Sequence, residues 1–212
     1  MAQVLHYRPT DPISHQYGPG YEVGRGEGAQ ALRCAALDAV LLGMLEEGEL
    51  KLSGEGFVLQ LKAGDCFVVP QGVALDWQAQ GALRYWFIRI PGVEGAASHG
   101  QPLKLALDGR LQSCNPPSAN VLLSPTPSAW SQAVFEQGAL RIGVWACEPY
   151  QRRQVEPGYS ELMHIIDGQI TLTESDGTQH TIAAGETVVV PAGATNAWAS
   201  EVLVRKVYCI YG

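Results

Sequence analysis

Residues 63–77 read AGDCFVVPQGVALDW, and residues 184–198 read AGETVVVPAGATNAW. Both segments contain an Ala-Gly-acidic turn, an apolar run that stops at proline, a further glycine and a tryptophan, and the shared residues lie 121 positions apart. A repeat of this length predicts two copies of one structural unit. Because proline cannot continue a central strand, we expect each apolar run to be a short buried strand that ends there.

Alternating apolar and polar residues precede each of these segments. Residues 169–174 and 179–182 alternate on either side of a Ser-Asp-Gly turn, and residues 49–61 do the same around a glycine-rich turn. Alternation interrupted by such a turn predicts a β-hairpin in each copy. With 24 glycines and 13 prolines, which break helices, and valine-rich runs between them, the sequence predicts an all-β protein.

The repeat divides the chain into three predicted parts. Residues 1–91 would form an N-terminal barrel carrying an irregular N-terminal arm, and residues 138–212 a C-terminal barrel. Residues 92–137 are rich in Gly, Pro, Ser and Ala, which is typical of a connector. We expect a short strand near residues 121–123 and little chemistry in this segment.

Composition argues against several classes of partner and location. The 14 Lys and Arg against 21 Asp and Glu give a net charge of −7 without basic clusters, so we expect no nucleic-acid partner. No apolar run reaches the roughly 18 residues that span a bilayer, so we expect no membrane partner. The first residues show no signal-peptide pattern, and the five cysteines are never spaced as CxxC. We therefore expect reduced thiols and a cytoplasmic location.

The spacing of glutamate, glycine and proline resembles that of a known superfamily. Glu161 and Gly168 frame an E-x6-G motif, and Gly185, Pro191 and Gly193 follow as G-x5-P-x-G. This arrangement resembles the cupin superfamily, and its recurrence suggests a bicupin. The C-terminal half, with GVWACEP, TLTESDG and VRKVY, resembles the small cupins related to ureidoglycine aminohydrolase and the ethanolamine-utilisation cupin. The resemblance implies two tandem cupin barrels, double-stranded β-helices of the jelly-roll type.

The resemblance also implies a metal site, which the N-terminal copy does not keep. Family sites take two His and a Glu from the first motif and one His from the second, and such ligands suit Mn, Fe, Ni or Zn. In the N-terminal copy Leu41 stands for the Glu and Leu75 for the late His. Apolar side chains cannot ligate a cation, so we expect no metal in that barrel.

In the C-terminal copy the motif glutamate is present as Glu161. The places of the histidine pair hold Gln154 and Glu156, or Val155 and Pro157, and Asn196 replaces the late histidine. We therefore expect no cofactor in this barrel. A divalent metal (Mn, Fe, Ni or Zn) stays open as an alternative, with Glu156, Glu161 and Asn196 as its candidate ligands.

Glu161 is the candidate catalytic residue. A carboxylate inside a barrel is costly unless it is paired, hydrogen-bonded, protonated or bound to a metal. One alternative is that Glu161 bonds a Tyr, an Arg or a backbone amide and only holds the barrel together. The other is that it faces a pocket and binds or deprotonates a small polar ligand. Strand alternation places Glu161 and Met163 on one face and His164 on the other, so His164 is expected to pack away from the pocket.

The candidate substrate-binding residues are aromatic or polar side chains expected near Glu161: Trp145, Tyr159, Met163, Asn196, Trp198 and Arg205. Arg205 and Lys206 are neighbours on the last strand, so one of them faces inward. Arg205 recurs as Arg84, whereas Lys206 is matched by Tyr85. If Arg205 faces inward, it could pair with Glu161 or hold a substrate carboxylate.

The function predicted from the sequence is that of a cytosolic bicupin that binds a small polar metabolite in its C-terminal barrel, without a full cupin metal site. One alternative is an enzyme, metal-dependent or metal-independent, that acts through Glu161 on a small amide, ureide or sugar. Another is a structural bicupin whose barrels serve assembly and bind no ligand. Open sheet edges would also suit a homodimer.

Overall fold

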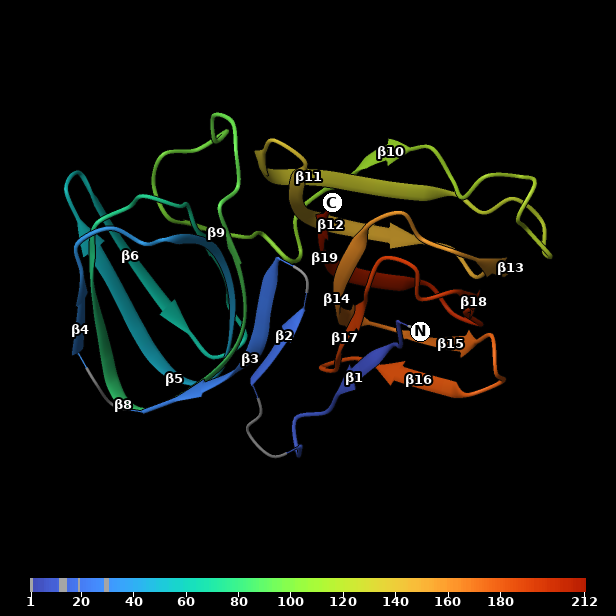
Figure 1. Cartoon of the computed structure of the whole chain (residues 1–212), viewed down its shortest axis with the longest axis horizontal. Coiled ribbons are helices and arrows are strands. Elements are labelled where there is room, and N and C mark those ends of the chain that lie inside the picture. Colours follow the sequence, from blue (N-terminus) through green and yellow to red (C-terminus); the bar gives the residue numbers. More distant parts are fainter. Residues whose placement is uncertain (1, 12–14, 19, 29–30) are drawn as a thin grey trace. The chain divides into compact units, whose positions relative to one another are not determined.

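The computed structural model describes residues 2–11, 15–18, 20–28 and 31–212, and within these residues the chain forms strands and no helix (Figure 1). The all-β prediction is confirmed. In the described part of the chain, no helix has the length and apolar character needed to cross a membrane. The strands form two compact units: an N-terminal unit of Pro12–Ala106 with Phe135–Gly138, and a C-terminal unit of Met1–Asp11, Leu107–Val134 and Ala139–Gly212.

The N-terminal unit is one eight-stranded sheet. Its strands are β2 (His15–Gly18), β3 (Tyr21–Glu27), β4 (Ala31–Cys34), β5 (Ala39–Gly54), β6 (Phe57–Lys62), β7 (Cys66–Val69), β8 (Leu75–Pro91) and β9 (Leu103–Lys104). They run in the order β2-β3-β8-β5-β7-β9, with β4 on β8 and β6 on β5. The long strands β5 and β8 pair along most of their length with register shifts around Glu47, and such irregularities bend a sheet. The predicted hairpin is the β5–β6 pair.

Aromatic rings fill the interior of the N-terminal unit. The Tyr85 ring lies over Gly26, where an added Cβ would come within 2.3 Å of it, and the Phe67 ring covers Gly43 in the same way. Trp77 contacts both rings, with centroids 6.0 Å from Phe67 and 5.2 Å from Tyr85. Each glycine therefore makes room for a ring from the neighbouring strand, and the rings occupy the space inside the barrel.

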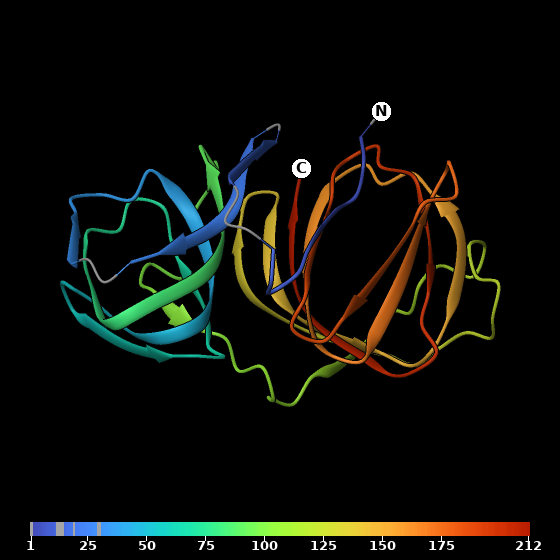
Figure 2. The same ribbon diagram turned by 90° about the horizontal axis from the view of Figure 1, so that it is seen from below.

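The C-terminal unit has two sheets that curve around one interior (Figure 2). The seven-stranded sheet has the order β1-β17-β14-β19-β12-β11-β10, and the four-stranded sheet β13-β18-β15-β16. The strands of these two sheets are β1 (Leu5–Tyr7), β10 (Gln112–Cys114), β11 (Ala129–Gln137), β12 (Leu140–Cys147), β13 (Gln151–Val155), β14 (Ser160–Asp167), β15 (Gln169–Glu174), β16 (Gln179–Ala183), β17 (Thr187–Val190), β18 (Asn196–Ala199) and β19 (Val204–Tyr211). The second predicted hairpin is the β15–β16 pair.

The N-terminal arm differs from the prediction. We expected residues 1–91 to belong to one barrel and their first part to be irregular, yet β1 pairs with β17 of the C-terminal unit. Val4 and Tyr7 are buried, and His6 Nε2 lies 3.0 Å from Glu186 Oε2. The physical reason is that β17 is buried along its whole length, so its outer edge needs a partner strand. Of the predicted arm, residues 1, 12–14 and 19 lie outside the described residues.

Equivalent residues of the sequence repeat have equivalent cross-strand partners in the structure. Leu41 pairs with Val69 on β7 and Arg89 on β8. Glu161 pairs with Val190 on β17 and Ile210 on β19, and these partners lie 121 positions after the first pair. Leu41 and Glu161 therefore occupy equivalent places, one inside an apolar cluster and the other beside a pocket.

The apolar character of the N-terminal interior can be tested by substituting Leu41 with Glu. Leu41 is 7% exposed within the apolar cluster. Its cross-strand neighbour Arg89 already pairs with Glu22 and Asp38, so the new carboxylate would find no free counter-charge among its described neighbours. We expect the substitution to lower the free energy of unfolding by roughly 3–5 kcal/mol, measured by chemical denaturation. Leu32→Glu, at a position 57% exposed, is the control and should change stability by less than about 0.5 kcal/mol. Equal effects of the two substitutions would contradict an apolar interior.

Candidate functional site

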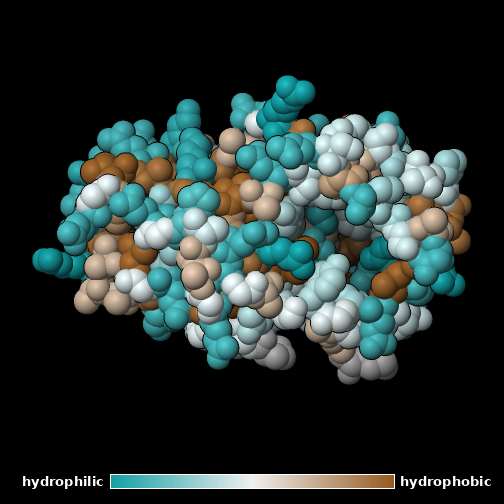
Figure 3. Space-filling model, turned by 90° about the horizontal axis from the view of Figure 1, so that it is seen from above, coloured by the Kyte–Doolittle hydropathy of each residue, from teal (hydrophilic) through white to brown (hydrophobic). Residues whose placement is uncertain are grey.

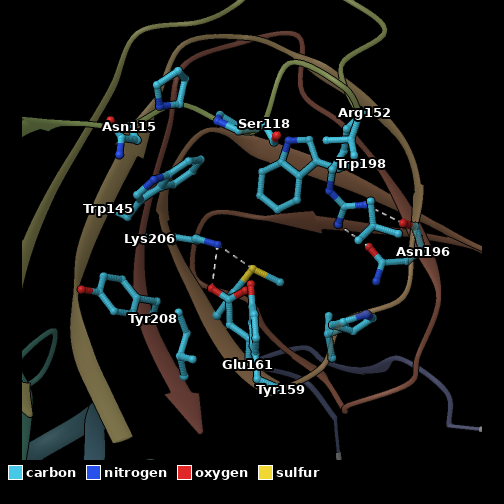
Figure 4. Close-up of a pocket in the computed structure, with 18 of the residues that line it drawn as sticks. Asn115, Ser118, Trp145, Arg152, Tyr159, Glu161, Asn196, Trp198, Lys206 and Tyr208 are labelled. Atoms are coloured by element: carbon cyan, nitrogen blue, oxygen red, sulfur yellow. Dashed lines mark hydrogen bonds and ion pairs between the residues drawn. The ribbon is translucent and has the colours of Figure 1, made fainter. Parts of the chain in front are cut away.

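A pocket of about 720 Å³ opens in the C-terminal unit. The surface over this unit is hollowed, and hydrophilic and hydrophobic residues meet at the hollow (Figure 3). The pocket is lined by side chains from the barrel strands and from the segment before β11, including Asn115, Ser118, Trp145, Tyr150, Arg152, Tyr159, Glu161, Met163, Asn196, Trp198, Lys206 and Tyr208 (Figure 4). Its volume is in the range typical of small-molecule sites.

Glu161 and Lys206 form an ion pair inside the barrel. Lys206 Nζ lies 3.0 Å from Glu161 Oε1, and the two side chains are 9% and 17% exposed, respectively. The register explains their meeting: on β14 and β19, Ile165 lies opposite Lys206 and Glu161 lies opposite Ile210. Directly opposed residues point to the same face of a sheet, so Lys206 shares the inward face with Glu161.

Aromatic and thioether groups surround the Lys206 ammonium. Its Nζ lies 2.9 Å from Met163 Sδ, 4.8 Å from the Trp145 ring centroid and 5.2 Å from that of Trp198. Ring faces attract a cation through their quadrupoles, most strongly when water is excluded. The ammonium is therefore held by one carboxylate and two indole faces, close to the pocket wall (Figure 4).

Trp198 is the centre of an aromatic wall. Its ring stacks on Tyr150 with centroids 5.4 Å apart and an interplanar angle of 16°, and meets Trp145 edge-on at 6.2 Å. Burial raises the pKa of the Tyr150 phenol, which keeps it neutral. The indole Nε1 of Trp198 is buried and finds no hydrogen-bond partner among the described residues. Such an unmatched donor is uncommon in native interiors.

Arg152 and Asn196 are locked together beside this wall. Arg152 Nη2 donates to Asn196 Oδ1 at 2.7 Å, and Arg152 Nη1 donates to the backbone oxygens of Asn196 and Arg153. Asn196 is 2% exposed, and its amide donates to the Ala194 carbonyl at 2.8 Å. Burial lowers the pKa of the Arg152 guanidinium, because the low-dielectric surroundings disfavour its charge.

The structure brings together most of the residues that the sequence analysis singled out. Glu161, the candidate catalytic residue, lines the pocket, as do the predicted binding residues Trp145, Tyr159, Met163, Asn196 and Trp198. Glu161 faces the pocket, and its partner is Lys206, not the Tyr, Arg or backbone amide that the first alternative named. Burial, together with the negative charge of Glu161, raises the pKa of Tyr159 at the rim.

Arg205 is the exception. We expected it to face inward, but its Nε and Nη2 donate to the carbonyls of Leu107 and Gly109, both at 2.6 Å. Its counterpart Arg84 pairs with Glu46 at 3.0 Å and is 44% exposed. Recurrence of this arginine in both copies therefore reflects a scaffold contact. The inward residue is Lys206, and the signal that could have identified it is its replacement by Tyr85 in the N-terminal copy.

Two groups of pocket residues were missed altogether. Arg152 was not considered, although it lies two residues before Gln154, a position examined for a metal ligand. The predicted connector was expected to carry little chemistry, yet its residues 114–118 and 121 line the pocket. Leu122 forms an isolated bridge with Arg152, which attaches this segment to β13. Proline and serine content alone does not show that a connector covers a barrel mouth.

His164 packs on the face of β14 opposite to Glu161, as alternation predicted. Its Nδ1 lies 2.9 Å from Thr187 Oγ1, and it is not among the pocket residues. Burial lowers the pKa of His164 to about 4, since the charged imidazolium would lose its hydration there.

The residues at the family metal position do not fit a divalent cation. Gln154 donates its amide to the carbonyls of Thr173 and Glu174, Glu156 is exposed, and Asn196 Oδ1 accepts from Arg152. The Lys206 ammonium already occupies Glu161 Oε1. Among the described residues no group of three or more His, Cys, Asp or Glu side chains is arranged to hold a metal ion. A positive side chain beside the one retained carboxylate would also repel a cation.

Comparison with known proteins identifies the domain that carries the pocket. Residues 134–208 match the family of EutQ-like cupin domains, so this part of the chain is a cupin domain. No curated protein matches the chain.

Solved structures extend the likeness to the rest of the chain. A protein of unknown function from Pseudomonas syringae pv. tomato str. DC3000 superimposes with a TM-score of 0.90 at 26% identity, covering 99% of this chain and 100% of its own. A cupin 2 conserved barrel domain protein from Leptotrichia buccalis superimposes with a TM-score of 0.67 at 12% identity, covering 100% of this chain and 90% of its own. A salicylate 1,2-dioxygenase from Pseudaminobacter salicylatoxidans superimposes with a TM-score of 0.63 at 11% identity, covering 94% of this chain and 76% of its own. The cupin fold is shared by proteins of varied function.

The lowered pKa of His164 predicts acid sensitivity. Above pH 6.5 the imidazole is neutral in both the folded and the unfolded chain, whereas between pH 6.5 and about 4 only the unfolded chain takes up the proton. The free energy of unfolding should therefore fall by roughly 2–3 kcal/mol across this window as pH decreases. His164→Gln should remove that part of the pH dependence in denaturation curves, whereas the exposed His99→Gln should keep it. An unchanged curve for His164→Gln would contradict a neutral buried imidazole.

The misfit of the ligand set predicts a low metal content. Elemental mass spectrometry on protein purified without a His-tag or chelator should find Mn, Fe, Ni and Zn far below one equivalent per chain, since Glu161 and Asn196 are already engaged. Lys206→Met, which frees Glu161, tests the physical reason and should raise Zn retention only slightly. One equivalent of a single metal in the wild-type protein would contradict this prediction.

Proposed function

We propose that the chain is a bicupin whose C-terminal barrel binds a small polar metabolite, with the Lys206 ammonium in place of a metal ion as the fixed positive charge. The observation that carries this proposal is the Lys206–Glu161 pair, which is largely buried and still borders the pocket. The N-terminal barrel would serve as scaffold, because its interior is occupied by its own rings.

Energetics support a ligand-directed role for this pair. Removing two charges from water costs several kcal/mol per ion, and well-packed apolar residues often stabilise a protein as much or more. The N-terminal barrel has Leu41 and Tyr85 at the equivalent places, so the scaffold tolerates uncharged residues there. Stability alone does not account for the charges, whereas binding of a polar ligand does.

The pair leaves hydrogen-bonding capacity for a ligand. A lysine ammonium has three N–H donors, of which one serves Glu161 and one faces the Met163 sulfur, a weak acceptor. Glu161 Oε2 receives no hydrogen bond from the described residues. A donor and an acceptor therefore lie side by side, as a hydroxyl, amide or ureide group requires. The same free carboxylate oxygen favours the second candidate, an enzyme with Glu161 as general base.

Both the tandem architecture and a cytoplasmic location belong to this proposal. The register equivalence of Leu41 and Glu161 supports two copies of the cupin barrel. All five cysteines are free, including Cys66, Cys147 and Cys209, which are buried. Reduced thiols suit a reducing compartment.

A ligand screen on matched variants tests the proposed function. Small hydroxy, amide and ureide metabolites would be screened by thermal shift against wild-type protein, Lys206→Met and Glu161→Gln. We expect compounds that stabilise the wild type to lose at least about tenfold in affinity in both variants, because each loses a hydrogen-bonding partner of the ligand. Turnover of any such compound by the wild type and not by Glu161→Gln would decide for the enzyme.

Folding of the variants is controlled separately. Lys206→Met leaves the Glu161 carboxylate without its partner and should cost roughly 3–5 kcal/mol, whereas the double variant Lys206→Met with Glu161→Leu should recover most of that loss. Tyr85→Phe, at the place equivalent to Lys206 in the N-terminal barrel, is the matched control and should bind like the wild type. If no compound stabilises the wild type, or if binding is the same in the folded double variant, the barrel is structural and the proposal is wrong.

A further inference from the structure

We propose that the ligand of this pocket carries a carboxylate, which Arg152 binds through the free edge of its guanidinium, and that a flat apolar part of the ligand lies against the indole wall. This inference rests on the proposed function and specifies its ligand as a small monocarboxylate with a ring or planar body.

The pocket contains a positive charge that no neighbouring carboxylate of the described chain balances. The Lys206 ammonium and the Glu161 carboxylate compensate one another at 3.0 Å. Arg152 also lines the pocket, and no described carboxylate lies within ion-pair distance of it. Arg141 and Glu156 are exposed lining residues of opposite sign. The partly enclosed part of the pocket thus has one positive charge in excess, which a monoanion would neutralise.

Arg152 keeps part of its hydrogen-bonding capacity for a ligand. A guanidinium has five N–H donors. Three of them serve the Asn196 side chain and the backbone carbonyls of Asn196 and Arg153. The Nε–H and one Nη2–H find no acceptor in the described part of the chain. These two groups project in parallel from one edge of the planar guanidinium, the geometry that the two oxygens of a carboxylate match.

Arg152 is held in place by the protein before a ligand arrives. Asn196 accepts from it at 2.7 Å and is itself fixed by the Ala194 carbonyl. A side chain immobilised by protein contacts loses less conformational freedom on binding than a free one. The acceptors that hold Arg152 are neutral, so they orient its charge without cancelling it.

The indole wall lies beside Arg152 and can contact the body of the ligand. Arg152 lies directly opposite Trp198 across the β13–β18 pair, and Trp198 stacks on Tyr150 and meets Trp145 edge-on. Figure 4 shows the guanidinium beside the Trp198 ring, between it and Asn196. A carboxylate at the arginine edge would place the rest of the molecule beside the indoles, whose edges can pack against the face of a planar ring.

Acid and amide pairs of the same shape test the charge requirement. Dissociation constants of benzoate and benzamide, and of indole-3-acetate and indole-3-acetamide, would be measured for the full chain by isothermal titration calorimetry. We expect each acid to bind roughly 10- to 100-fold more tightly than its amide. Arg152→Gln should remove that preference, because it lowers the affinity for the acids far more than the affinity for the amides. Arg153→Gln, an exposed neighbour on the same strand, should keep it.

The outcomes separate this inference from the proposed function. The inference would be overturned by equal affinity of acid and amide in the wild type, or by an acid preference that survives in Arg152→Gln. In either case, Lys206-dependent binding of a neutral compound would still uphold the proposed function. Phenyl phosphate binding more tightly than benzoate would also overturn it, since a dianion exceeds the single positive charge. Failure of every acid to bind at millimolar concentration would count against the inference. Arg152→Lys and circular dichroism control for folding, and Arg152→Lys should restore only part of the preference.

Discussion

Two opposite charges lie 3.0 Å apart in an otherwise largely apolar barrel, and neither would be tolerated there alone. Glu161 needs Lys206 as counter-charge, and Lys206 in turn determines what surrounds it: the Met163 sulfur and the faces of two indoles. The strand register that brings positions 161 and 206 to one face is therefore the constraint on which the pocket depends. A shift of one residue would turn Arg205 inward and leave the pair broken.

The two units show how equivalent strand pairs can enclose a filled or a hollow interior. In the N-terminal unit Tyr85 lies over Gly26, whereas the equivalent partners in the C-terminal unit are Lys206 and Trp145. The Tyr85 ring, which helps to fill the N-terminal interior, corresponds to the charged side chain of Lys206 in the C-terminal unit. The glycine that made room for the ring is exchanged for an indole that contacts the charge. These exchanges are coupled, since an indole at position 26 would collide with Tyr85 and a lysine at position 85 would lack its carboxylate.

Strand-level features of the fold could be predicted from the sequence because they depend on local spacing. Alternation placed Glu161 and Met163 together and His164 apart, and glycine and proline marked the hairpins and strand ends. The errors concern information that local spacing does not contain. The pairing of β1 with β17 and the contribution of residues 114–118 to the pocket depend on contacts between distant segments. Choosing Arg205 over Lys206 treated recurrence as a sign of function, whereas a site present in one copy is marked by the residues that differ.

In the proposed function, a lysine in place of a metal would make the pocket independent of metal supply. A bound metal is subject to exchange and chelation, whereas Lys206 is covalently part of the chain. The ammonium also has directional N–H donors, so it can orient a ligand oxygen through a hydrogen bond. With Glu161 beside it and the Arg152–Asn196 pair on the neighbouring sheet, the barrel presents donors, an acceptor and aromatic faces in fixed positions. For the proposed ligand, such an arrangement would provide selection by charge and shape together.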